Sequence, residues 1–171
     1  MEYPGTDWYI EYKEQMDVGY RYYDKHPEEI CYPFGHGLSY SDFIYRNLQV
    51  HEEDEHILLS MQIENTGKYD GEEVIQLYVG REIFTVPSSI KELKAFRKVF
   101  IRCGEVVDVH FKISKQELSY YNTMLGMWIV ESGKYRFYLG SSSRDIRLEK
   151  TIKIKGNQPY SMLPNGKDMI G

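Results

Sequence analysis

The chain has 171 residues and a formal net charge of −5, a length sufficient for one domain with a substantial hydrophobic core. Because its basic residues form no dense cluster, the composition predicts neither a nucleic-acid-binding nor a membrane-binding surface. No apolar run approaches the roughly 20 residues that cross a bilayer. The first residues lack the pattern of a secretory signal, and the two cysteines, Cys31 and Cys103, are too few for a disulfide framework. We therefore expect a cytoplasmic protein, with a single Cys31–Cys103 bridge left open.

Residues 1 to about 31 are polar and aromatic, and they predict an irregular N-terminal extension. Only WYIEY and VGYRYY favour short strands there, and HPEE indicates a loop. The stretch CYPFGHGLSYSDF, residues 31–43, follows with two glycines around a histidine. It is consistent with an active-site loop, a metal site on His36 or a structural joint. Glycines on both sides of a side chain favour the joint, because they indicate special φ angles or close backbone approach.

From about residue 43 onward, apolar and polar residues alternate with the period of half-buried antiparallel strands. HILLSMQIENTG, EVIQLYVG, EVVDVHFKI and KYRFYLGSS show this most clearly; their inward-facing residues are Ile57, Leu59, Met61, Ile63, Ile75, Leu77, Val79, Val107, Val109, Phe111, Ile113, Tyr135, Phe137 and Leu139. Turn residues separate these runs at short intervals, which predicts an all-β sandwich or barrel. SKQELSYYN is the one expected helical turn, with Ser114 as N-cap and Glu117 three residues on.

No candidate catalytic, cofactor or metal residue is predicted from these patterns. The carboxylate runs at 28–29, 52–55 and 72–73 lie in turns or at strand starts, where we expect solvated surface rather than the paired acids of glycoside hydrolysis. The histidines show no metal-binding spacing; they are His26, His36, His51, His56 and His110. GSSSRD lacks the GxSxG elbow, and the chain has neither a P-loop nor GxGxxG.

Sixteen tyrosines are many for this length. They suit either strand positions, where the ring is buried and the hydroxyl stays hydrated, or platforms that stack against sugars. Their even spread favours strand positions.

Several motifs in a fixed order resemble glycoside hydrolase family 3, the family of β-glucosidases and β-xylosidases. YPFGHGLSYSDF (Tyr32–Phe43) is similar to the family's PFGxGLSYTxF signature, and YKEQMDVGYRYYD (Tyr12–Asp24) resembles its YxEGixVGYRYYD, with Gln15 at a usual glycine. YPG at residues 3–5 also matches. The downstream matches are ENTGKYDGEEVIQLYV, PSSIKELKAFRKVFIRCGE and MWIVESGKYRFYLGSSSRDIRL. Together they cover residues 3–148.

This resemblance implies the C-terminal fibronectin type III-like β-sandwich of such an enzyme. We assign residues 1–37 to the remnant of a preceding α/β domain and linker, 38–156 to the sandwich and 157–171 to a tail or linker. In the family, an aspartate on a barrel domain and a glutamate on the α/β domain catalyse hydrolysis, and no residues here match either region. Asp7, in TDW, resembles the motif of the nucleophile but lies where that motif does not belong.

The resemblance implies a non-catalytic accessory domain, inactive alone, whose partners are the parent enzyme's barrel and α/β domains. A polysaccharide-binding module with exposed aromatics is the alternative. We predict that Phe34, Leu38, Tyr40 and Phe43 are buried in the joint, and that Trp128 is a core or inter-sheet residue. Residues 1–31 are expected to be poorly ordered or to self-associate through aromatics, namely Trp8, Tyr9, Tyr20 and Tyr22.

Overall fold

The computed structural model describes residues 16–82 and 88–157. Two short helical segments, α1 (Tyr20–Lys25) and η1 (Pro27–Glu29), precede the strands. The remaining elements are β1 (Phe43–Glu53), β2 (His56–Asn65), β3 (Gly71–Arg81), β4 (Glu92–Ile101), β5 (Val106–Ser114), η2 (Lys115–Leu118), β6 (Tyr120–Asn122), β7 (Met127–Ile129), β8 (Gly133–Gly140) and β9 (Ile146–Ile154). Among the described residues, no helix is long and apolar enough to cross a membrane.

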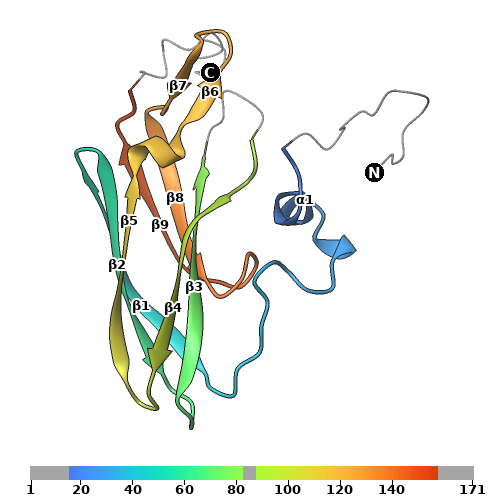
Figure 1. Cartoon of the computed structure of the whole chain (residues 1–171), viewed down its shortest axis with the longest axis vertical. Helices are drawn as coiled ribbons and strands as arrows, with labels where there is room; N and C mark the ends of the chain where they lie inside the picture. Colours follow the sequence, from blue (N-terminus) through green and yellow to red (C-terminus); the bar gives the residue numbers. More distant parts are fainter. Residues whose placement is uncertain (1–15, 83–87, 158–171) are drawn as a thin grey trace.

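The strands form two facing antiparallel sheets (Figure 1). One sheet has the order β1-β2-β5 and the other the order β4-β3-β8-β9, while β6 and β7 form a separate hairpin. In Figure 1 this hairpin lies at the opposite end of the sandwich from the point where the chain enters β1. The predicted all-β sandwich is therefore confirmed.

Side chains that the alternation directs inward fill the space between the sheets. The four apolar residues of β2 and the three of β3 named above are each at most 5% exposed. On β5, Val109, Phe111 and Ile113 are buried, whereas His110 on the opposite face is exposed, as expected. Burial of these faces is the main stabilising contribution, at roughly 25 cal/mol for each Å² of apolar surface removed from water.

Asn65 closes the turn after β2 from inside the protein. Its side chain is fully buried, and Nδ2 donates to the carbonyl oxygens of Tyr69 at 2.8 Å and Ile101 at 3.0 Å. Its Oδ1 accepts from the amide of Gly67 at 3.0 Å. A buried amide with these partners has no unmet hydrogen bond, so this polar residue is compatible with the core.

The predicted helical turn at SKQEL is a 3₁₀ segment, η2, with the expected capping box. The Ser114 hydroxyl accepts from the Gln116 amide at 3.2 Å, and the Glu117 carboxylate accepts from the Ser114 amide at 2.8 Å. This reciprocal pair satisfies amides that a helix start leaves without partners.

The N-terminal segment corrects one prediction: VGYRYY contributes to helix α1 rather than to a strand. Tertiary contacts override its strand propensity. The Tyr20 ring packs on Phe34 and Tyr78, at 5.3 and 5.8 Å between centroids, and its hydroxyl accepts from the Leu93 amide at 2.8 Å. A nearly buried ion pair, Lys91 Nζ to Asp24 Oδ2 at 2.6 Å, also joins the segment to the sandwich.

Tyr20 is therefore packed within its own chain, which contradicts the expected disorder or self-association for that residue. The Tyr22 ring also has partners within the chain, stacking on His26 at 4.4 Å between centroids. WYIEY, Trp8, Tyr9 and the residues after 157 lie outside the described residues. The strands run from Phe43 to Ile154. The predicted domain boundary between residues 37 and 38 stays a prediction.

Candidate functional site

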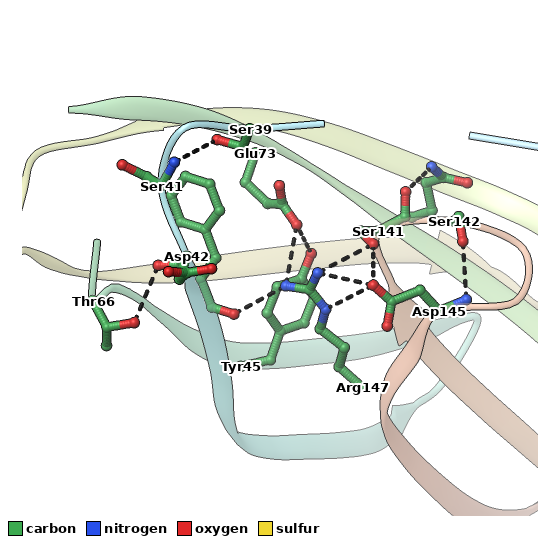
Figure 2. Close-up of polar contacts among 12 residues, drawn as sticks. Ser39, Ser41, Asp42, Tyr45, Thr66, Glu73, Ser141, Ser142, Asp145 and Arg147 are labelled. Atoms are coloured by element: carbon green, nitrogen blue, oxygen red, sulfur yellow. Dashed lines mark hydrogen bonds and ion pairs between the residues drawn. The ribbon is translucent and has the colours of Figure 1, made fainter. Parts of the chain in front are cut away.

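The densest polar cluster among the described residues lies where the linker meets the sandwich. We call it the junction cluster; its members are Tyr45, Glu73, Ser141, Asp145 and Arg147 (Figure 2). The Arg147 guanidinium contacts Asp145 Oδ2 at 2.9 Å and Glu73 Oε1 at 3.4 Å, and lies 4.9 Å from the centre of the Tyr45 ring. The cluster thus joins strands of both sheets around one cation.

Two further hydrogen bonds complete the cluster. The Tyr45 hydroxyl donates to Glu73 Oε1 at 2.8 Å, and the Ser141 hydroxyl donates to Asp145 Oδ2 at 2.7 Å. Arg147 also donates to the Phe43 carbonyl oxygen at 3.0 Å. Each carboxylate already has a cation and a hydroxyl as partners, so the geometry is that of a structural tie between strands.

Burial and pairing shift the two carboxyl groups in opposite directions. Burial raises the pKa of Glu73, although the Tyr45 hydrogen bond and the Arg147 charge oppose that rise. Hydrogen bonds from Arg147 and Ser141 lower the pKa of the more exposed Asp145. Burial, with the neighbouring Glu73 carboxylate, raises the pKa of the Tyr45 hydroxyl well above its usual range.

Glu73 corrects the expectation of solvated surface at residues 72–73. It is 8% exposed, whereas Glu72 is exposed. The signal was present in the sequence, because extending the alternation of Ile75, Leu77 and Val79 backwards by two residues places Glu73 on the inward face. A buried carboxylate is unexpected unless it has partners, and Glu73 has them in Tyr45 and Arg147.

The linker, residues 32–42, is held at both of its ends. The Phe34 carbonyl oxygen accepts from the Ser143 amide at 2.8 Å, and the Asp42 carbonyl oxygen accepts from the Thr66 amide at 2.8 Å. Gly35 has a φ of +83°, and a Cβ there would lie 2.1 Å from Gln76 Nε2. The prediction that this motif needs glycine is therefore confirmed at Gly35. At Gly37 no described atom lies within 4 Å of an added Cβ.

A cavity of about 430 Å³ lies between this linker and the junction cluster. His36 lines it, but its ring has one contact among the described residues, with the Tyr32 ring at 5.0 Å. Because no carboxylate or nucleophile of the described residues partners this imidazole, the geometry supports the structural interpretation of the motif.

Three of the four side chains predicted to be buried in the joint are exposed. Phe43 is 8% exposed and belongs to the core, but Phe34 is 50%, Leu38 95% and Tyr40 96% exposed. Together with Tyr32, these three form what we call the linker face. The prediction was wrong for them because nothing within the described residues covers this side of the linker.

Trp128 is also not a core residue: it is 59% exposed on the β6–β7 hairpin. It lies directly opposite Tyr121, with the rings edge to face at 5.7 Å between centroids. The hairpin has only three residues in each strand and lies at the end of the sandwich, so these two rings lie outside the packed core.

Within residues 16–82 and 88–157, neither the cysteines nor the cluster around His26 indicates a site. Cys31 and Cys103 are both free and exposed, so they form no disulfide with each other. Within the described part of the chain, His26, Glu28 and Glu29 could offer metal ligands close together, but they are solvent-accessible side chains on a surface turn. Such exposed groups commonly gather without an ion.

Known proteins are similar in sequence to this chain over most of its length. The fibronectin type III-like domain family matches residues 73–143. The chain is 43% identical over 158 residues to thermostable β-glucosidase B of Acetivibrio thermocellus, covering 90% of this chain and 21% of that protein. It is 40% identical over 151 residues to β-glucosidase BoGH3A of Bacteroides ovatus, covering 86% and 20%. Residues 73–143 thus match a fibronectin type III-like domain, and the chain is similar over most of its length to one segment of these larger β-glucosidases.

Solved structures support this assignment of the fibronectin type III-like domain. The family 3 β-glucosidase of Bifidobacterium adolescentis superposes with a TM-score of 0.87 at 31% identity, covering 99% of this chain and 27% of that one. The β-glucosidase 3B of Thermotoga neapolitana, solved with glucose, gives 0.79 at 38% identity and covers 85% and 20%. The chain thus spans about a fifth of the length of its curated relatives.

Proposed function

We propose that this chain is a non-catalytic accessory domain that binds the catalytic domains of a family 3 glycoside hydrolase through its linker face. The observation that carries the proposal is the exposure of Leu38 and Tyr40, at 95% and 96%, on a linker tied down at Phe34 and Asp42. An apolar surface that a fixed backbone holds in water is characteristic of an interface. The parent enzyme would hydrolyse terminal β-linked sugars such as β-glucosides.

The outer face of the β4-β3-β8-β9 sheet extends this surface. Phe96 and Phe100 on the edge strand β4 are 68% and 54% exposed, and Val74 on β3 is 37% exposed. Phe96 pairs with Gln76, whose side chain lies under Gly35 of the linker. The exposed phenylalanines are therefore close to the linker, and we assign both areas to one interface with the catalytic domains.

Binding to an extended polysaccharide is the second candidate, and the aromatic geometry disfavours it. The exposed rings are divided between the linker face with the adjoining β4, the β6–β7 hairpin and, at Tyr69, the turn between β2 and β3. Tyr121 and Trp128 are inclined by 69° to each other, so they do not form a flat row. Self-association through the linker face would cover the same apolar surface when the catalytic domains are absent.

The two free thiols agree with a reducing, cytoplasmic location.

Complementation tests the main proposal. The A. thermocellus β-glucosidase B would be truncated to remove the region similar to this chain, and the 171-residue chain would be added in trans. We expect the two proteins to co-elute from a sizing column and the melting temperature of the truncated enzyme to rise. A Leu38→Asp, Tyr40→Asp double variant should lose both effects, because carboxylates would be buried in the interface.

Val106→Asp is the matched control, since Val106 is 54% exposed but lies on β5 of the other sheet. It should bind as the wild type does. If the double variant bound as tightly as Val106→Asp, the linker face would not be the interface. Hydrolysis of an aryl β-glucoside by the purified chain alone would overturn the non-catalytic assignment.

A further inference from the structure

The second large cavity of the sandwich lies beside the β6–β7 hairpin, and the proposed docking of catalytic domains does not use it. It has a volume of about 480 Å³, within the range of roughly 300–1,000 Å³ typical of small-molecule sites. Tyr121 and Trp128 are among the residues that line it. Their exposed fractions, 50% and 59%, leave both rings free to contact a ligand.

Charged side chains also line the cavity, and each of them, Arg81, Glu92 and Lys94, has an oppositely charged partner. Arg81 Nη1 lies 2.8 Å from Glu131 Oε2, with exposed side-chain fractions of 11% and 3%. Lys94 Nζ donates to Glu92 Oε2 at 2.8 Å, and both residues line the cavity. Because these charged groups already have ionic partners, they offer hydrogen-bond donors and acceptors without an unpaired charge, which favours a neutral ligand over a phosphate or carboxylate.

Ser89 supplies an independent indication of a ligand. It lines this cavity and is 2% exposed, and its hydroxyl has no hydrogen-bond partner among the described residues. An unpaired buried hydroxyl costs free energy, so native structures seldom leave one without a partner. A ligand hydroxyl in the cavity would provide that partner.

From these features we infer that the cavity is a binding site for one neutral pyranose unit of a sugar. A pyranose has an apolar face of C–H groups, which fits the indole of Trp128, and an equatorial rim of hydroxyls, which fits the paired charges and Ser89. The mutual tilt of Trp128 and Tyr121 admits a single ring rather than a stretched chain. The site is independent of the linker face.

Cellobiose is the probe, and the full chain is the protein to be tested. Trp8 and Trp128 are its two tryptophans, so a Trp8→Phe variant reports on Trp128 alone. We expect its fluorescence to change saturably with millimolar cellobiose, and titration calorimetry to give the same affinity. Glycerol, which carries hydroxyls but no ring, should produce no saturable change.

Calorimetry on variants locates the site. Trp128→Ala should weaken cellobiose binding by at least about tenfold, because the stacking surface is lost. Ser89→Ala should weaken it by a smaller factor, about threefold, through one lost hydrogen bond. Tyr40→Ala removes an exposed ring on the linker face and should change nothing.

Trp128→Phe is the second variant, which retains an aromatic ring and should bind with intermediate affinity. Three results would overturn the proposal: no saturable binding of cellobiose, glycerol acting as well as cellobiose, or equal losses for Trp128→Ala and Tyr40→Ala. These outcomes are separable from the complementation experiment, since Leu38 and Tyr40 do not line this cavity.

Discussion

Arg147 on β9 donates a hydrogen bond to the carbonyl oxygen of Phe43 on β1, at 3.0 Å. This contact joins the last strand of one sheet to the first strand of the other, where the linker enters the sandwich (Figure 2). The same guanidinium forms ion pairs with Glu73 and Asp145. One side chain therefore ties the linker junction to both sheets.

Arg147→Met should lower the free energy of unfolding by about 2–4 kcal/mol, because the mostly buried Glu73 loses its cation and Phe43 its donor. Chemical denaturation of the isolated chain measures this change. Arg136→Met is the control: its pair with Glu82, at 3.4 Å, has both partners partly exposed. That substitution should cost under about 1 kcal/mol. Equal losses would show that the junction has no special role.

The free energy of unfolding of Glu73→Gln should increase relative to that of the wild type as pH rises from about 4 to about 7. The pKa of Glu73 is raised in the folded state, mainly by burial, so the folded chain holds this proton where the unfolded chain has released it. Stability from this group is therefore present at low pH and lost as pH rises. The substituted amide would avoid that loss and could still accept from Tyr45. Melting curves across this range provide the test, and a difference independent of pH would refute it.

Asp145→Asn should show the opposite pH dependence. The pKa of Asp145 is lowered in the folded state by hydrogen bonds from Arg147 and Ser141. Its stabilising contribution is present at neutral pH and disappears as pH falls through that lowered pKa. The variant should thus melt below the wild type near neutrality and converge with it in acid. Divergence on acidification would contradict the assignment.

Gly35→Ala and Gly37→Ala should differ strongly although they are two residues apart. At Gly35 a side chain meets a positive φ and the buried Gln76 amide, so we expect a loss of about 2–3 kcal/mol. At Gly37 none of the described atoms lies within 4 Å of an added Cβ. That change should be neutral or stabilise the protein by up to about 1 kcal/mol. Thermal melts of the two variants are sufficient to compare them.

Phe43→Ala should cost about 3–5 kcal/mol, as expected for a phenylalanine removed from a packed core. Phe34→Ala should cost far less in the isolated chain, since half of its side chain is already exposed and its described ring contact is with Tyr20. Bound to the catalytic domains, the Phe34 variant should instead lose affinity. A larger loss for Phe34 than for Phe43 in the isolated chain would contradict the structure.

Strand alternation in the sequence determined the all-β class and the inward residues, and the spacing of Ser114 and Glu117 determined the expected helical turn. The reason is that a period of two places Ile57, Leu59 and Phe111 on buried faces whichever strands pair. The motifs around residues 32–43 likewise identified the family, since they depend on residue identity alone. The exposed His110 also followed from the period.

Only the tertiary structure decided which aromatic and charged residues are buried. Leu38, Tyr40 and Trp128 are apolar or aromatic in sequence, yet each is more than half exposed because the described residues cover it only in part or not at all. Glu73 is acidic yet buried, because Tyr45 and Arg147 arrive from distant strands to satisfy it. Burial depends on what packs against a residue, and sequence period alone specifies only the face on which it lies.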